Sequence, residues 1–137
     1  MIKSIFVSFS LLLISQQNFA QSQILGRWIS EDKKGITEIF LRNEMYYGKI
    51  VWVKPDKDTP FTDIENPDRS KRSQPLINLV ILKGFAYRNN EWENGTVYDP
   101  ANGKTYNCTM KLLNNNTLRV RGHWGPFYRT ELWSKFK

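Results

Sequence analysis

The sequence of 137 residues contains only one cysteine, Cys108, and one histidine, His123. A single cysteine cannot form an internal disulfide, so stability must come from the core. One cysteine and one histidine cannot supply the three or four ligands of a zinc site. Cys108 lies among apolar neighbours, where a thiol stays protonated, and residue alternation places His123 on the opposite face. We therefore expect an inert thiol, no Cys–His catalysis, no metal and no cofactor.

Long hydrophobic runs are missing, except at the N-terminus. There Lys3 precedes an apolar stretch at residues 5–14, a polar run at residues 15–18 and the small residue Ala20. A cation, a short apolar segment and a small residue in this order are typical of a secretory signal peptide. The stretch is too short for a membrane-spanning helix, which needs about 20 residues. We therefore expect residues 1–20 to be cleaved, and the mature chain to be periplasmic or secreted without a transmembrane segment.

Acidic residues are fewer than basic ones, and the formal net charge is +7. This balance can indicate nucleic-acid binding, but an exported protein seldom meets nucleic acid. The basic residues are also dispersed, with one cluster at residues 68–72. We therefore expect no nucleic-acid partner and interpret the charge as favouring solubility, with anionic ligands or surfaces as the alternative.

The chain after residue 20 has no convincing amphipathic helix. Short apolar runs recur between turn signals, which is typical of an all-β protein. The predicted strands are residues 25–30, 35–41, 45–53, 76–84, 85–92, 96–98, 104–113, 117–124 and 127–136. They number eight if residues 85–92 continue the preceding strand, and nine if they do not.

Apolar and polar side chains alternate most clearly in the late strands. The residues predicted to share the apolar face are Tyr106, Cys108, Met110, Leu112, Leu118, Val120 and Trp124. Short turns, such as residues 99–103, join the strands into a meander, and closing this sheet on itself removes its edges. We therefore predict that residues 21–137 form a small antiparallel lipocalin-like barrel of about eight strands in up-and-down order. A two-sheet sandwich is the alternative.

Residues 54–75 interrupt the series of strands. They contain four prolines and many charges, with only Phe61 and Ile64 available for burial. A loop of this length is usually functional or disordered, and we interpret it as a candidate lid. Its oxygen-bearing residues include Asp63, Glu65, Asn66 and Asp68. They lack the glycine and terminal glutamate of a calcium loop, so we expect a solvated loop rather than a cation site.

Gly26-Arg27-Trp28 in the first strand, with Arg129 on the last, resembles the signature of lipocalins and their calycin relatives. In those proteins the tryptophan closes one end of the barrel, and an arginine of the last strand stacks across it. The guanidinium gains cation–π attraction and donates to nearby carbonyls. The resemblance implies that Trp28 and Arg129 form a structural plug and not an active site.

A closer resemblance covers nearly all of residues 21–137. Its motifs are Gly26-x-Trp28, Tyr47-Gly48-Lys49-Ile50-Val51-Trp52, Asn66-Pro67, Gly84-Phe85, Trp92-x-x-Gly95, Val97-Tyr98-Asp99-Pro100 with Gly103-Lys104-Thr105-Tyr106, Leu118-x-Val120-x-Gly122 and Arg129-Thr130-x-x-Trp133. In order and spacing they are similar to the bacterial exported family known as domain of unknown function 2147. Asn78 departs from the family, which tends to have glycine there. The resemblance implies export and a calycin-like barrel, and it implies no activity.

Tyr98, Asp99, Lys104 and Tyr106 form the densest polar and aromatic cluster. In one interpretation Asp99 caps its turn and Lys104 pairs with it; in the other the cluster lines the mouth of the barrel. If a ligand binds, the residues expected to contact it are Trp52, Tyr98, Tyr106 and Trp124, with Lys104 or Arg121 as a charged anchor.

Three functions stay open. The first is a non-enzymatic protein that binds a small apolar, amphiphilic or anionic ligand in or at the mouth of the barrel. The second is an envelope interaction or structural protein whose basic outer face, with Arg119 and Arg121, and long loop contact an envelope protein or an anionic polymer. The third is a hydrolase that uses Asp99 or the loop carboxylates. The sequence contains no recognisable set of catalytic residues, so we expect no enzyme activity.

Overall fold

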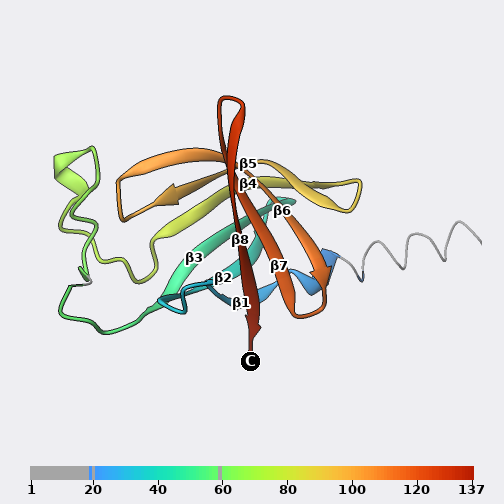
Figure 1. The fold of residues 1–137 in the computed structure, drawn as a ribbon, viewed down its shortest axis with the longest axis horizontal. Coiled ribbons are helices and arrows are strands. Elements are labelled where there is room, and N and C mark those ends of the chain that lie inside the picture. The colour runs from blue at the N-terminus through green and yellow to red at the C-terminus, as the bar shows by residue number, and fades with distance from the viewer. Residues whose placement is uncertain (1–18, 20, 59) are drawn as a thin grey trace, which may run out of the picture.

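The computed structural model describes residues 19, 21–58 and 60–137. Its strands are β1 (Gly26–Ile29), β2 (Gly35–Arg42), β3 (Met45–Val53), β4 (Val80–Arg88), β5 (Glu91–Asp99), β6 (Lys104–Asn114), β7 (Thr117–Trp124) and β8 (Phe127–Phe136). Each strand pairs antiparallel with the next, and β1 pairs with β8 to close a barrel (Figure 1). The prediction of a small up-and-down lipocalin-like barrel is confirmed.

The predicted signal peptide, residues 1–20, lies outside the described residues apart from Phe19, which is exposed. In the part of the chain that is described, no helix is both long and apolar enough to cross a membrane.

The chain turns between β4 and β5 at Asn89 and Asn90, whose φ angles are 52° and 63°. Gly84 has a φ of 74° but lies inside β4, and the strand continues through Phe85. A separate strand at residues 85–92 is therefore wrong, and the eight-strand alternative is confirmed. Glycine within a strand often marks a bulge or a bend and need not end the strand.

Large side chains fill the half of the barrel in which β1 begins. The fully buried ones include Trp28, Leu82, Phe85, Trp92, Met110 and Leu118. A residue with a side chain does not fit at Gly95, because the ring of Phe85 lies where its Cβ atom would be. Aromatic side chains remove large areas of apolar surface from water, so this half is a solid hydrophobic core.

Trp28 closes this end of the barrel, but the cation that lies over its ring is Lys135 and not Arg129. The Trp28 indole Nε1 donates to the carbonyl oxygen of Ile24 at 2.8 Å. Lys135 Nζ lies 4.7 Å from the centre of the Trp28 ring and donates to the carbonyl oxygen of Leu25 at 2.6 Å. The strand register places Lys135 opposite Trp28, whereas Arg129 is exposed farther along β8. The prediction that Arg129 stacks on Trp28 is therefore wrong.

The long connection from β3 to β4 is built around a buried carboxylate, Asp63. It accepts hydrogen bonds from the Tyr98 hydroxyl at 2.6 Å, from Asn66 Nδ2 at 2.8 Å and from Gln74 Nε2 at 3.1 Å. This connection also contains the short 3-10 helix η1 (Arg69–Lys71). The expectation of a solvated loop is wrong at Asp63, which is 1% exposed. A buried carboxylate needs such donors, so the loop is tied to β5.

Two residues with positive φ angles, Gly103 and Asn78, also help to position this loop. Gly103, in the turn from β5 to β6, has a φ of 73°, and the carbonyl oxygen of Glu65 occupies the place of its missing Cβ. The loop therefore packs against the β5–β6 turn, beside which it lies in Figure 1. Asn78 has a φ of 71° and donates its backbone N–H to the carbonyl oxygen of Ile50 at 2.7 Å. Asparagine tolerates this conformation better than most residues other than glycine.

Candidate functional site

A hollow of about 460 Å³ opens at the end of the barrel opposite the Trp28 plug. It is lined by Lys104 and Tyr106 of β6 and by Trp124 of β7. Trp124 is 51% exposed, so its ring forms part of the rim. The structure thus brings together three of the six residues predicted to contact a ligand.

Strand alternation and a tight turn position the side chains of this hollow. Lys104, Tyr106 and the buried Cys108 occupy every second position of β6. Asp99 Oδ1 accepts a hydrogen bond from Ala101 N at 2.9 Å, which stabilises the preceding turn. This confirms that Asp99 caps its turn, while Lys104 lines the hollow. In the described part of the barrel, no ion pair joins Lys104 to Asp99, so the first interpretation holds for Asp99 alone, and ligand binding by the cluster stays a prediction.

The aromatic wall is held by contacts on both sides. The Tyr106 and Trp124 rings lie 6.0 Å apart, centre to centre, at an interplanar angle of 55°. Asn102 Nδ2 donates a hydrogen bond to the Tyr106 hydroxyl at 3.0 Å. Tilted ring pairs of this kind attract each other beyond simple burial, so the wall is partly organised without a ligand.

Gly122 of β7 lies beside Tyr106, one of the residues that line the hollow. A Cβ atom there would lie 3.7 Å from Tyr106 Cβ and 3.7 Å from Val97 Cγ1, which is ordinary van der Waals contact. A larger side chain at Gly122 would therefore extend beside Tyr106. Gly122 and Asn102 were not predicted as site residues, because their proximity to Tyr106 depends on the barrel register.

Trp52 lies at a different place, on the outside of the barrel. It lines a groove of about 290 Å³ with Arg27, Ile29, Ile36, Val51 and Phe136. The pairing of β2 with β3 shifts between Ile36 and Thr37, so that Val51 is an extra residue. This bulge changes the alternation, and Trp52 no longer shares the inward face of Ile50.

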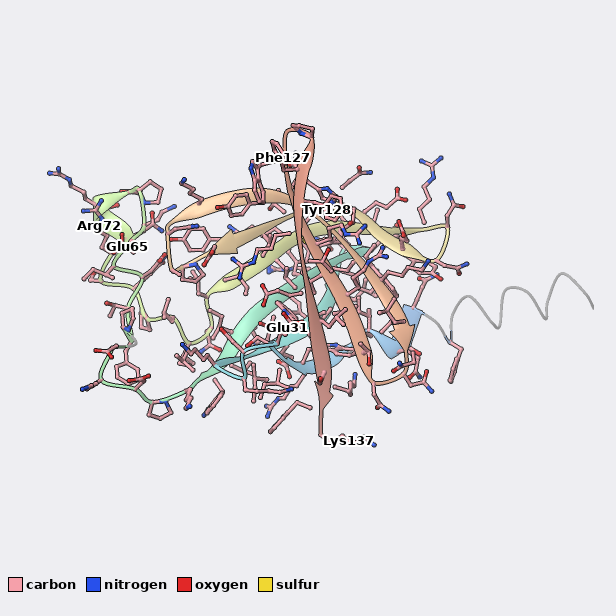
Figure 2. All side chains as sticks on the ribbon, in the orientation of Figure 1. Glu31, Glu65, Arg72, Phe127, Tyr128 and Lys137 are labelled. Carbon is pink, nitrogen blue, oxygen red and sulfur yellow. The ribbon has the colours of Figure 1, made fainter. Side chains whose placement is uncertain are left out.

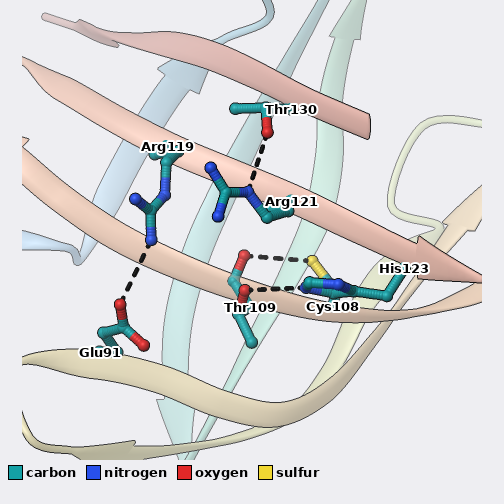
Figure 3. A network of polar contacts seen from close by, with 7 residues as sticks. All are labelled: Glu91, Cys108, Thr109, Arg119, Arg121, His123 and Thr130. Carbon is teal, nitrogen blue, oxygen red and sulfur yellow. Dashed lines mark hydrogen bonds and ion pairs between the residues drawn. The ribbon is translucent and has the colours of Figure 1, made fainter. Parts of the chain in front are cut away.

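Tyr98 and Arg121 also lie apart from the hollow. The Tyr98 hydroxyl bonds to Asp63, and burial together with this bond raises the pKa of Tyr98 well above its usual range. Arg121 Nε donates to Thr130 Oγ1 at 2.9 Å on the outer face (Figure 3), and its Cζ lies 4.4 Å from the centre of the Tyr128 ring. Lys104 is therefore the one predicted anchor that lines the hollow.

The thiol and the imidazole lie on opposite faces of the barrel wall, as predicted. Burial raises the pKa of the Cys108 thiol to about 12, so the thiol is protonated at neutral pH. His123 Nε2 lies 3.2 Å from Thr109 Oγ1 on the outer face (Figure 3). Among the described residues, no three His, Cys, Asp or Glu side chains gather in a group that could hold a metal ion.

Comparison with known proteins agrees with this architecture. The family model "Uncharacterized protein conserved in bacteria (DUF2147)" matches residues 26–135. The chain belongs to this family. A solved structure similar to this DUF2147 protein is protein HP1028 from the human pathogen Helicobacter pylori, which is described as belonging to the lipocalin family. The two have a TM-score of 0.73 and 20% sequence identity, and the match covers 83% of each chain.

The comparison with curated proteins found no match. Since the similarity to HP1028 is 20% in sequence, it supports the lipocalin-like fold and does not identify a ligand.

Proposed function

We propose that this DUF2147 protein is an exported, non-enzymatic binding protein that holds one small amphiphilic ligand at the open end of its barrel. The observation that carries the proposal is the hollow lined by Lys104, Tyr106 and Trp124. Its volume of about 460 Å³ is within the range of about 300–1,000 Å³ common for small-molecule sites. The lipocalin-like fold supports a binding role by analogy.

The three lining side chains define the chemistry of the ligand. The Tyr106 and Trp124 rings offer apolar faces to a flat or aliphatic body. The Lys104 ammonium is a compact cation at the rim and attracts an anionic group. We therefore expect a ligand with an apolar body and one carboxylate, sulfonate or phosphate group.

The alternative role, an envelope contact through the basic outer face, has less support. Arg119 Nη2 lies 3.2 Å from Glu91 Oε1, and Arg121 is held by Thr130 (Figure 3). Both guanidinium groups are thus engaged within the barrel wall. Polymer binding through them would require these contacts to be exchanged or shared.

Two dyes with the same ring system can test the proposal. Anilinonaphthalene sulfonate is an anionic amphiphile, and phenylnaphthylamine lacks the sulfonate. We expect one molecule of either dye to bind, measured by fluorescence titration. Tyr106→Ala should weaken both dyes, and Gly122→Leu should exclude both. Lys104→Gln should weaken only the sulfonate dye, by about fivefold for a partly exposed ion pair.

Trp52→Ala is the matched control, because it changes an aromatic residue of the outer groove. Dye binding that is lost in Trp52→Ala but unchanged in Tyr106→Ala and Gly122→Leu would refute the site. Native mass spectrometry of protein purified from its own cell envelope supplies a second readout. A stoichiometric adduct that Gly122→Leu no longer carries would give the mass of the natural ligand.

A further inference from the structure

The connection between β7 and β8 extends beyond the rest of the barrel wall. β7 pairs with β8 as far as Trp124 and Phe127, whereas β1 pairs with β8 only between Ser134 and Phe136. One edge of the hairpin is therefore without a neighbouring strand near the turn. Figure 1 shows this hairpin as the red loop that projects from the body of the barrel.

Three aromatic side chains gather at the projecting end. Trp124, Phe127 and Tyr128 are 51%, 63% and 57% exposed. Figure 2 places Phe127 and Tyr128 at the end of the hairpin, far from Lys137. The Trp124 and Phe127 rings lie 6.4 Å apart, centre to centre. Tyr128 pairs with His123 and lies on the other face of the hairpin, so exposed rings cover both faces of the projecting end. Single exposed aromatics are ordinary, but several at one projecting turn indicate an interaction site.

Basic side chains surround this aromatic tip. The Arg121 Cζ lies 4.4 Å from the centre of the Tyr128 ring, and Arg129 is exposed directly after Tyr128. Lys104 shares the hollow with Trp124. The hairpin between residues 121 and 131 carries one acid, Glu131, which is half-buried. The tip therefore presents apolar rings with basic side chains nearby.

We propose that the tip formed by Trp124, Phe127 and Tyr128 docks on the surface of an anionic lipid bilayer. Tryptophan and tyrosine favour the boundary between lipid headgroups and acyl chains, because each has an apolar body and a polar end. The exposed cations Arg129 and Lys104 complement lipid phosphates. Without the predicted signal peptide, which carries Lys3 and no acidic residue, the formal net charge is +6 and attracts the whole protein to such a surface.

The shape of the tip favours a bilayer over a folded protein partner. Gly125, with a φ of 55°, and Pro126 make a short turn, so the apolar surface is narrow and projecting. A stable protein interface needs about 800 Å² on each partner, usually with shape complementarity over that area. A bilayer adapts to a narrow tip, and the rings enter it without a preformed pocket.

Docking in this way would also orient the barrel. Trp124 belongs both to the tip and to the wall of the hollow. The open end would therefore lie close to the membrane surface, where amphiphilic molecules are concentrated. Membrane docking does not depend on ligand binding, since it rests on the exposed side chains alone.

Vesicle cosedimentation tests the proposal with a matched pair of phenylalanines. Phe127→Ser removes a tip ring that is 63% exposed, and Phe61→Ser removes a ring of the long loop that is 60% exposed. The vesicles contain phosphatidylethanolamine and phosphatidylglycerol, and phosphatidylcholine vesicles serve as the uncharged control. We expect Phe127→Ser to weaken binding about tenfold and Phe61→Ser to leave it unchanged.

The charge contribution is tested separately. Arg129→Gln should weaken binding to the anionic vesicles about fivefold, because each cation near such a surface contributes roughly that factor. Tryptophan fluorescence should shift to the blue when the wild-type protein binds vesicles. Raising the salt concentration to about 1 M, where the screening length is about 3 Å, should reduce binding strongly.

Several outcomes would overturn the proposal. Wild-type protein that stays in the supernatant with anionic vesicles would do so, as would equal binding of the Phe127→Ser and Phe61→Ser variants.

Binding of Phe127→Ser to anilinonaphthalene sulfonate, measured without vesicles, separates this proposal from the ligand site. Dye binding at wild-type strength with lost vesicle binding supports the docking role. Normal vesicle binding by Gly122→Leu would show that docking does not need the hollow.

Discussion

The two ends of the barrel differ in how their tryptophans are used. At the plugged end Trp28 is completely buried, its indole N–H is bonded to a carbonyl, and Lys135 lies over its ring. At the open end Trp124 is half exposed, and its ring forms part of a hollow and of a projecting tip. One wall of strands thus carries a stabilising core at one end and apolar side chains available to a partner at the other.

Replacing each tryptophan with alanine gives the largest expected contrast. Trp28→Ala should lower the free energy of unfolding by about 3–5 kcal/mol, because a large cavity replaces a buried ring. Trp124→Ala should change it by less than about 1 kcal/mol. Urea denaturation followed by circular dichroism measures both. Similar losses at the two positions would mean that the ends do not differ in this way.

The cation of the plug gives the next contrast. Lys135→Met should lower the free energy of unfolding by about 1–3 kcal/mol, since the carbonyl oxygen of Leu25 loses its donor. Arg129→Met, at an exposed position of the same strand, should stay within about 0.5 kcal/mol of the wild type. Lys135→Arg should recover part of the loss. A larger effect at Arg129 would contradict the assignment of Lys135 to the plug.

Asp63 tests how the long loop is held against β5. Asp63→Ala leaves the Tyr98 hydroxyl and the Asn66 and Gln74 amides without their acceptor. We expect faster cleavage of the loop by trypsin and a loss of about 1–2 kcal/mol in the free energy of unfolding. Glu65→Ala, which removes an exposed carboxylate of the same loop, is the control. Equal cleavage rates for the two variants would show that Asp63 does not hold the loop.

A change in pH should have the smallest effect on the free energy of unfolding. Burial raises the pKa of Glu131 above its usual value, and Arg129 opposes this only in part. The folded state therefore binds the Glu131 proton more tightly than the unfolded state does. Its contribution to stability is present at low pH and is lost as pH rises through the folded-state pKa. Urea denaturation at several pH values should show Glu131→Gln gaining stability over the wild type as pH rises; a constant difference would contradict this.

The strands of the last third were predictable because burial follows the alternation of the sequence. Cys108 and Met110 are buried, and His123 lies on the outer face. Trp52 was predicted to contact the same ligand as Tyr106, and this prediction is not supported by its place in the outer groove. A bulge is not visible in a hydrophobic pattern that continues through it, so the exchange of faces at Val51 could not be foreseen.

The sequence by itself determined the class of fold, the order of the strands and the membership of the DUF2147 family. The class of fold and the order of the strands depend on local alternation and turn chemistry, which short windows of sequence reveal, whereas the family follows from the resemblance of its motifs. Only the tertiary structure decided that Lys135 replaces Arg129 at the plug, that Asp63 is buried and that Gly122 lies beside Tyr106. Each of these depends on which residues of distant strands become neighbours, because register and closure are properties of the whole barrel.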